Sequence, residues 1–202
     1  SLLPKLGINK HIIGIMPFTE NLIGENTYKP SEIIKTYSGK TIEITNTDGE
    51  GRLILADAIS YAVQKYAPEY LIDVATLTGA CMFALGDRYA GLFSNDRALS
   101  DKLQEAGDEV DELLWPLPIH KEHSEKMKGY YADLRNSDTG FERQAGASKG
   151  AAFIKEFIGK DTKWAHLDIA GPAFTTDPKK YEQKGATGFG VRALLRFLEK
   201  GL

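Results

Sequence analysis

The sequence predicts an α/β fold, a three-layer αβα arrangement in which a mixed, mostly parallel sheet is covered by helices on both faces. Short apolar, β-branched runs recur along the chain, and the stretches between them carry apolar residues at helical spacing. Strands that alternate with helices form a parallel sheet whose crossover helices bury both of its faces. No internal repeat or low-complexity linker interrupts the 202 residues, so residues 1–202 are expected to form one domain.

Each element is predicted from its local pattern. The apolar, β-branched runs indicate strands at residues 11–16, 41–45, 71–75, 89–94 and 164–170. Apolar residues three and four apart, or runs of small residues, indicate helices at residues 53–66, 78–85, 99–106, 120–128, 145–158 and 191–199. Pro17 and Pro68 end the elements before them, and Gly86 and Gly159 stop two helices. The polar stretch 19–37 is expected to be an ordered loop, available for substrate or subunit contacts.

Composition argues against several classes of function. Hydrophobic residues make up 42% of the chain and charged residues 26%, which is typical of a globular domain. The formal net charge of -3 provides no general attraction for nucleic acid, so a nucleic-acid partner is not expected. No apolar run approaches the roughly 18 residues of a membrane span. The single cysteine, Cys81, lies in an apolar run and is expected to be a buried structural thiol in a reducing, cytoplasmic setting.

A glycine-rich acidic turn, NTDGEGRL at residues 46–53, follows the second predicted strand. Ligands of open α/β sheets bind at the carboxyl ends of strands. In extended chain, residues two apart point to the same side, so Asp48 and Glu50 are expected to aim two carboxylates at one place. Oxygen ligands suit divalent ions, and the Arg52 fork suits an anion beside them. The same pattern also occurs as an acidic helix N-terminus with a surface ion pair, and spacing alone leaves both interpretations open.

Three further segments follow in order, DVATLTGA at residues 73–80, WAHLDIAG at 164–171 and KGATG at 184–188. Together with NTDGEGRL they resemble the leucyl (cytosol) aminopeptidase family over nearly the whole chain. The signature octapeptide of that family usually has alanine where this chain has Gly49, a change that removes no ligand. The implied activity is metal-dependent release of N-terminal amino acids, leucine and similar, from peptides.

The resemblance implies a role for each matching residue. Asp48 and Glu50 are expected to ligate two divalent ions, Mn2+ or Zn2+, with Glu50 bridging both. Arg52 is expected to hold a bicarbonate ion that acts as general base. The residues expected to line the substrate cleft are Thr76, Leu77, Gly79, Ala170 and Ala173. Among these, the Leu77 carbonyl is expected to face the peptide.

The other metal ligands of the family, a lysine and two aspartates, lie upstream of the acidic turn. Residues 1–46 of this chain contain no aspartate, and their lysines stand in no matching motif. The chain is therefore expected to be the C-terminal portion of an aminopeptidase catalytic domain. As given, it is expected to bind metal weakly and to be inactive. The resemblance also implies a homo-hexamer for the full-length protein.

Other candidates were weighed from the residues. His120 and His123, three apart on a predicted helix, are a possible ligand pair but more typical of a solvated face. His166 and Asp168 alternate on a strand and are expected to serve a structural hydrogen bond on one face. A non-catalytic assembly or DNA-binding module with the same fold is the alternative from another class. A magnesium-dependent phosphoesterase ranks last because the sequence has no phosphate-binding loop.

Overall fold

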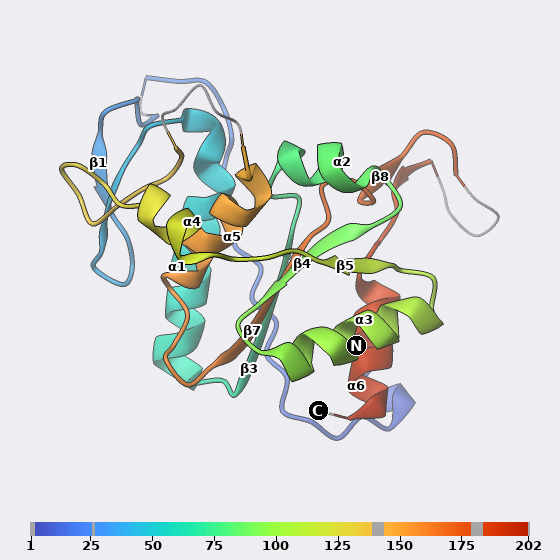
Figure 1. The fold of residues 1–202 in the computed structure, drawn as a ribbon. Coiled ribbons are helices and arrows are strands. Elements are labelled where there is room, and N and C mark those ends of the chain that lie inside the picture. The colour runs from blue at the N-terminus through green and yellow to red at the C-terminus, as the bar shows by residue number, and fades with distance from the viewer. Residues whose placement is uncertain (1–2, 26, 139–143, 179–183, 202) are drawn as a thin grey trace. The chain divides into compact units, whose positions relative to one another are not determined.

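The structure, a computed structural model, describes residues 3–25, 27–138, 144–178 and 184–201. Contacts divide the chain into two compact units (Figure 1). Unit 1 comprises Ser1–Gly14, Ile72–Leu117 and Lys163–Leu202, and unit 2 comprises Ile15–Leu71 and Pro118–Thr162. Each unit is assembled from segments far apart in the sequence. The expectation of one domain for residues 1–202 stays a prediction.

Unit 1 is built on a four-stranded sheet. Its strands lie in the order β3 (Tyr70–Ala75), β7 (Lys163–Asp168), β4 (Ala90–Ser94) and β5 (Leu114–Pro116). The central strand β4 runs parallel to β5 and antiparallel to β7. The sheet is therefore mixed, as predicted.

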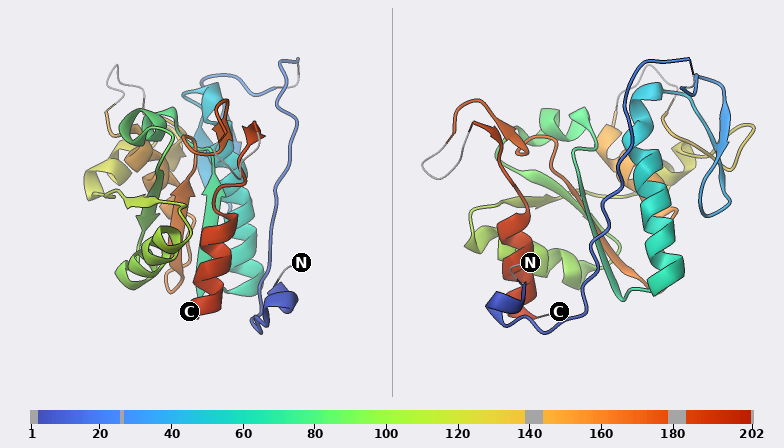
Figure 2. Two further views of the ribbon diagram at one scale, coloured as in Figure 1. Left: turned by 90° about the vertical axis from the view of Figure 1, so that its right-hand side faces the viewer. Right: turned by 180° about the vertical axis from the view of Figure 1, so that it is seen from behind.

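Helices cover both faces of this sheet. The helices of unit 1 are α2 (Gly79–Leu85), α3 (Arg97–Glu109) and α6 (Val191–Lys200). A Cβ added at Gly91 of β4 would lie 2.7 Å from Cys81 Sγ, which places α2 on the Gly91 face. A Cβ at Gly107 of α3 would lie 3.3 Å from Leu114 Cγ, and Leu114 is the cross-strand partner of Ala90. Because neighbouring residues of a strand face opposite ways, α3 covers the other face. Figures 1 and 2 show α6 packed beside α3.

Unit 2 combines a small sheet with helices. Its strands are β1 (Ile33–Lys35), β2 (Thr41–Glu43) and β6 (Leu134–Arg135). Strand β2 pairs antiparallel with β1 and parallel with β6. The helical segments are the 3-10 turn η2 (Thr47–Gly49) and the α-helices α1 (Glu50–Tyr66), α4 (Lys121–Lys126) and α5 (Gly146–Lys155). Helix α5 packs against both α1 and α4.

Three short elements complete unit 1, namely the 3-10 helix η1 (Leu3–Leu6) and the strands β8 (Phe174–Thr175) and β9 (Gly185–Ala186). Strands β8 and β9 pair antiparallel. Across the described parts of both units, no helix combines the length and apolar character needed to cross a membrane.

The predicted strand at residues 11–16 is wrong. These residues have no regular secondary structure, and Ile12 and Ile13 are 41% and 40% exposed rather than buried. A strand needs a hydrogen-bonded neighbour, and none of the strands in the described residues pairs with this segment. The predicted loop 19–37 in turn contains β1. The predicted strands at 71–75, 89–94 and 164–170 and all six predicted helices are confirmed, with shifted ends.

Cys81 is buried, as predicted. Its Sγ lies 3.7 Å from the main-chain oxygen of Asp168. Burial, and secondly the negative charge of Asp168, raises the pKa of the Cys81 thiol to about 11. The residue therefore belongs to the interface between α2 and the sheet of unit 1.

Glu112 holds the start of the C-terminal helix α6. The residue is 2% exposed, and its Oε2 accepts hydrogen bonds from Gly190 N at 3.0 Å and Ala193 N at 2.8 Å. Its Oε1 pairs with Arg192 Nε at 3.0 Å. A carboxylate at a helix N-terminus satisfies amides that have no partner within the helix, and it opposes the positive end of the helix dipole.

We expect Glu112→Ala to lower the free energy of unfolding by about 2 kcal/mol, since two helix amides lose their acceptor inside the protein. Urea unfolding followed by circular dichroism measures this change. Glu109→Ala is the matched control, because Glu109 also reaches α6, through Arg196 and Lys200, from an exposed position. Equal effects of the two substitutions would contradict a specific role for Glu112.

Candidate active site

The acidic turn joins β2 to α1 in unit 2. Asn46 caps the 3-10 turn, its Oδ1 accepting a hydrogen bond from Asp48 N at 3.0 Å. Helix α1 begins at Glu50, three residues before the predicted start at residue 53. The prediction that Asp48 and Glu50 alternate in extended chain is therefore wrong, because the chain is already turning into a helix there. Asp48 is exposed and Glu50 is half-buried, so both remain accessible to a ligand.

Asn136, which directly follows β6, holds this turn from the side. The residue is fully buried. Its Oδ1 accepts hydrogen bonds from Thr45 N at 2.9 Å and Asn46 N at 3.2 Å, and its Nδ2 donates to Asn46 O at 2.6 Å. The side chain thereby satisfies three main-chain groups at the end of β2. Sequence reasoning missed Asn136, since nothing distinguishes one asparagine in a polar stretch from an exposed one.

Arg52 is anchored to the same frame. Its Nη1 donates to the main-chain oxygen of Asn136 at 2.6 Å, and the side chain is half-buried. This contact fixes one arm of the guanidinium relative to the acidic turn. Gly49 fits closely, because a Cβ there would lie 2.8 Å from Asn136 Nδ2. The aminopeptidase family that the sequence resembles usually has alanine at this position. An alanine here would require the Asn136 amide to shift.

Two side chains from the segment before β1 reach the turn. Asn21 Nδ2 donates to Glu50 Oε1 at 3.3 Å, and the Tyr28 hydroxyl donates to Thr47 O at 3.3 Å. Burial, and secondly the charge of Glu50, raises the pKa of Tyr28. The predicted loop therefore does contact the candidate site, through these two residues.

Asp48 and Glu50 fit only part of a metal centre. Within the described residues, no group of three or more histidine, cysteine, aspartate or glutamate side chains is arranged to hold a metal ion. Two carboxylates provide fewer ligands than the four to six that zinc or magnesium-like ions take. A complete centre would need donors beyond those that the described part of the chain brings together.

The residues predicted to line a substrate cleft lie in unit 1, at the ends of two neighbouring strands. Thr76, Leu77 and Gly79 follow β3, and Ala170 and Ala173 follow β7. Thr76 and Gly79 are exposed, while the other three are half-buried. The structure thus brings these five residues to one region of unit 1.

Asp168, the last residue of β7, joins the two segments. Its Oδ1 accepts hydrogen bonds from Leu77 N at 3.1 Å, Thr78 N at 3.4 Å and Ala170 N at 3.2 Å. Its Oδ2 accepts from Thr78 Oγ1 at 2.7 Å. The carboxylate is fully buried, so these donors offset the cost of removing its charge from water.

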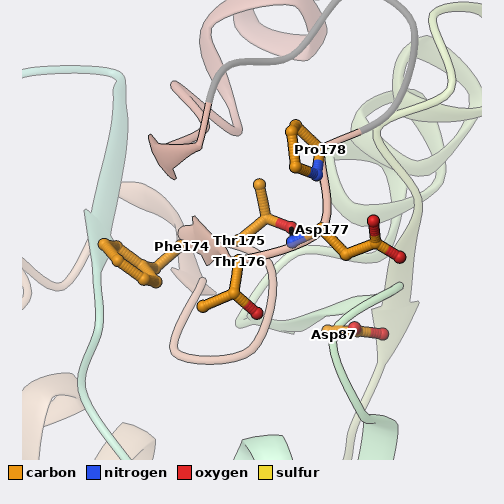
Figure 3. A pocket seen from close by; sticks show the side chains of 6 residues that line it. All are labelled: Asp87, Phe174, Thr175, Thr176, Asp177 and Pro178. Carbon is orange, nitrogen blue, oxygen red and sulfur yellow. Dashed lines mark hydrogen bonds between the residues drawn. The ribbon is translucent and has the colours of Figure 1, made fainter.

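A pocket of about 350 Å3 lies beside these segments in unit 1 (Figure 3). It is lined by Asp87, Phe174, Thr175, Thr176, Asp177 and Pro178. Figure 3 shows the two aspartate carboxylates on one side and the Phe174 ring on the other. None of the predicted site residues lines this pocket, although one of its lining residues, Phe174, directly follows Ala173 in the sequence.

Three of the four histidines, namely His120, His123 and His166, make structural hydrogen bonds. His120 caps α4, its Nδ1 accepting from Glu122 N, and His123 Nδ1 accepts from His120 N at 3.1 Å. These nitrogens are therefore used by the helix cap rather than offered to a metal. His166 and Asp168 do share one face of β7, because they pair with Phe93 and Gly91 of β4. However, the two side chains do not bond to each other in the hydrogen bonds described, since each has partners of its own.

The partner of His166 is Asp73 of β3. The His166 Nδ1 and Asp73 Oδ1 atoms lie 2.6 Å apart, and Asp73 Oδ2 accepts from Trp164 Nε1 at 2.7 Å. A structural hydrogen bond was predicted for His166, and it is confirmed. Because β3 lies next to β7 in the sheet, His166 pairs with Asp73 on the neighbouring strand and not with Asp168 on its own strand.

Unit 2 places an acidic turn directly after strand β2, and unit 1 places loop segments directly after the neighbouring strands β3 and β7. Ligands of α/β proteins bind at such strand ends. The cytosol aminopeptidase family, catalytic domain, matches residues 1–195. The chain belongs to this family, which confirms the family membership predicted from the sequence.

Relatives from three organisms support the assignment. The chain is 50% identical over 197 residues to a "Probable cytosol aminopeptidase" of Cenarchaeum symbiosum, covering 96% of this chain and 40% of the relative. A protein of the same description from Roseiflexus castenholzii is 50% identical over 195 residues, covering 96% and 39%. Another from Nitratidesulfovibrio vulgaris is 46% identical over 193 residues, covering 96% and 38%. The chain therefore spans about two fifths of the length of these relatives.

A solved structure of a tomato leucine aminopeptidase mutant has the same fold. It superposes with a TM-score of 0.82 at 40% sequence identity, covering 90% of this chain and 34% of that chain. The α/β fold predicted from the sequence is confirmed by this likeness.

We expect Asn136→Ala to weaken the acidic turn by about 3 kcal/mol, because it removes three buried hydrogen bonds and leaves main-chain groups unsatisfied. Amide hydrogen exchange at Thr45 and Asn46 measures the loss directly. Asn21→Ala is the control, since it removes one exposed contact to the same turn and should change stability by less than about 0.5 kcal/mol. Unaltered exchange in the Asn136 variant would show that other contacts hold the turn.

We also expect α4 to lose protection as the pH falls. Burial, and secondly the positive charge of His120, lowers the pKa of His123, while Glu122 opposes and Lys149 of α5 adds to this shift. The folded chain then binds fewer protons than the unfolded chain, whose histidine pKa is about 6.5. The stabilisation is present above that value and is lost as the pH falls through the lower, folded pKa.

Amide exchange of residues 121–126 between pH 7.5 and 5 tests this expectation. His123→Asn retains a side-chain acceptor that does not titrate in this range, so its pH dependence should be smaller. Identical protection of α4 at both pH values in the unsubstituted chain would contradict the expected link between His123 protonation and the stability of α4.

Proposed function

We propose that this chain is part of an aminopeptidase that releases N-terminal amino acids, leucine and similar, from peptides with the help of two divalent metal ions. The observation that carries the proposal is the family match over residues 1–195, which includes the acidic turn. The coarse assignment to a peptidase family rests on the same match. The metal, the reaction and the substrate are the finer parts of the proposal.

In this proposal Asp48 and Glu50 supply carboxylate ligands, with Glu50 shared between the two ions. The accessible position of both residues on a turn held by Asn136 supports these roles. When bound, two ions such as Mn2+ or Zn2+ would lower the pKa of a water molecule and polarise the scissile carbonyl. Because the described residues bring together no group of three or more candidate ligands, the remaining donors are proposed to come from outside this chain.

Arg52 is proposed to hold a bicarbonate ion that serves as general base. A guanidinium can bind a planar oxyanion with two parallel hydrogen bonds. The bond from Nη1 to Asn136 O restricts the rotation of the Arg52 side chain, which lowers the entropic cost of binding an anion. Thr76, Leu77, Gly79, Ala170 and Ala173 are proposed to line the cleft for the peptide.

The proposed partners are peptide substrates and, in the full-length protein, further copies in a homo-hexamer. Neither a membrane nor a nucleic-acid partner is proposed, and the net charge of -3 supports the second point. The relatives are described as cytosol aminopeptidases, which supports a cytoplasmic location.

We expect the 202-residue chain alone to bind Mn2+ or Zn2+ weakly and to leave leucine p-nitroanilide unhydrolysed, since its site is incomplete. Calorimetric titration and a colorimetric assay measure the two properties. A fusion supplies the remaining residues, with the region that precedes the match in the Cenarchaeum symbiosum relative placed before this chain. We expect this fusion to be active.

In the fusion, Asp48→Asn or Glu50→Gln should lower activity by more than about 100-fold, because each removes a metal ligand. Asp57→Asn is the matched control on α1, the helix that begins at Glu50, since its exposed carboxylate accepts only from Tyr37 N among the hydrogen bonds described. Full activity of the isolated chain would contradict the incomplete-site proposal, and an active Asp48 or Glu50 variant would contradict the assigned roles. A gel shift with duplex DNA at physiological salt tests the DNA-binding alternative.

A further inference from the structure

The buried carboxylate of Asp168, at the end of β7, has hydrogen-bond partners in two different loop segments. It accepts hydrogen bonds from both segments that follow β3 and β7, namely from Leu77, Thr78 and Ala170. Hydrogen bonds to a charged acceptor are about twice as strong as neutral ones. The ends of these two segments are therefore held on one anionic group inside unit 1.

Thr78 extends this connection to a helix. Its Oγ1 donates to Asp168 Oδ2 at 2.7 Å and accepts from Cys81 N at 3.2 Å, which caps the start of α2. Thr78 is buried, so water cannot easily replace either contact. The strand end, the intervening segment and the first turn of α2 thus form one hydrogen-bonded unit.

The orientation of the Leu77 carbonyl follows from these contacts. The carbonyl of Leu77 and the N–H of Thr78 belong to the same planar, trans peptide group, in which they point in opposite directions. Thr78 N points toward Asp168 Oδ1, at 3.4 Å. The Leu77 carbonyl must therefore point away from the buried carboxylate. Leu77 is half-buried, and Thr76 and Gly79 on either side of this stretch are exposed.

We propose that Asp168 is a positioning residue for substrate: through Leu77 and Thr78 it turns the Leu77 carbonyl outward, where it can accept a hydrogen bond from an N–H group of a bound peptide. Asp168 itself does not touch the substrate. The inference rests on the proposed function, because it assumes that the segment after β3 lines a peptide cleft. It assigns the orientation of this segment to one buried side chain.

The test uses two pairs of variants. Asp168→Asn keeps the size of the side chain and the Oδ1 acceptor but removes the charge, whereas Asp168→Ala removes all the contacts. Thr78→Val removes the hydroxyl at nearly constant volume, and Thr78→Ser restores it. Because Asp168→Ala can fail to fold, the conclusion depends on Asp168→Asn and on the Thr78 pair.

We expect Asp168→Asn and Thr78→Val to raise KM for leucine p-nitroanilide by about 10-fold in the active fusion, with a smaller change in kcat. Thr78→Ser should restore KM to within about 2-fold. Metal affinity, measured by calorimetry, should stay unchanged, because the acidic turn is not altered. In the 202-residue chain, amide exchange at Leu77 and Thr78 should accelerate by about 10-fold in the same two variants.

The outcomes separate the two proposals. If the unsubstituted fusion is inactive, the proposed function fails and this inference fails with it. If that fusion is active but Asp168→Asn leaves KM unchanged, the positioning role is overturned while the proposed function stands. Faster exchange at Leu77 without a change in KM also overturns it, since Asp168 would then be structural only. A fall in metal affinity equal to the rise in KM would likewise contradict the assignment.

Discussion

A polar group buried in a protein must find hydrogen-bond partners, and in this chain that requirement determines the conformation of the segments around the candidate site. The Asp168 carboxylate lies in the interior of unit 1 and is tolerated because donors from two loop segments surround it. The same hydrogen bonds therefore stabilise the buried carboxylate and fix the conformation of the two segments. Asn136 plays the corresponding part in unit 2, with a neutral amide in place of a charge.

The same constraint recurs wherever chain ends and helix starts approach the core. Glu112 satisfies the first amides of α6, and Asp73 accepts from the Trp164 and His166 rings. In each case one buried side chain joins elements that are far apart in the sequence. The apolar core drives the collapse of each unit, while these polar contacts select one arrangement of the loops.

Much of the fold could be predicted because helices and central strands carry their own periodic pattern. Strand β7 and helix α3 were found in this way, since the burial of each depends on its own residues. Residues 11–16 have the composition of a strand, but a strand also needs a neighbour, which local pattern does not reveal. Strands of two or three residues, such as β6, are too short to show any periodicity.

The sequence identified the residues proposed to act chemically at the candidate site but not the buried side chain that holds them in place. Asp48, Glu50 and Arg52 stand in one recognisable run, so a single window of sequence finds them. The Asn136 side chain that holds this run lies 90 residues away from Asn46, and only the pairing of β2 with β6 brings the two together. His166 and Asp168 were correctly expected to share one face of their strand, but the hydrogen-bond partners of each depend on the order of strands in the sheet.

The environment of Cys81 has a practical consequence. A thiol with a pKa of about 11 is almost wholly protonated at neutral pH, and only the thiolate reacts readily with alkylating reagents. Modification of the folded chain must therefore await a transient opening that exposes the sulfur to solvent. Cys81 lies in the first turn of α2, next to the Thr78 cap. The rate of its alkylation therefore reports how often the start of this helix opens transiently in the folded chain. Because Cys81 is the single cysteine of the sequence, this opening rate can be measured without introducing a label or removing another thiol.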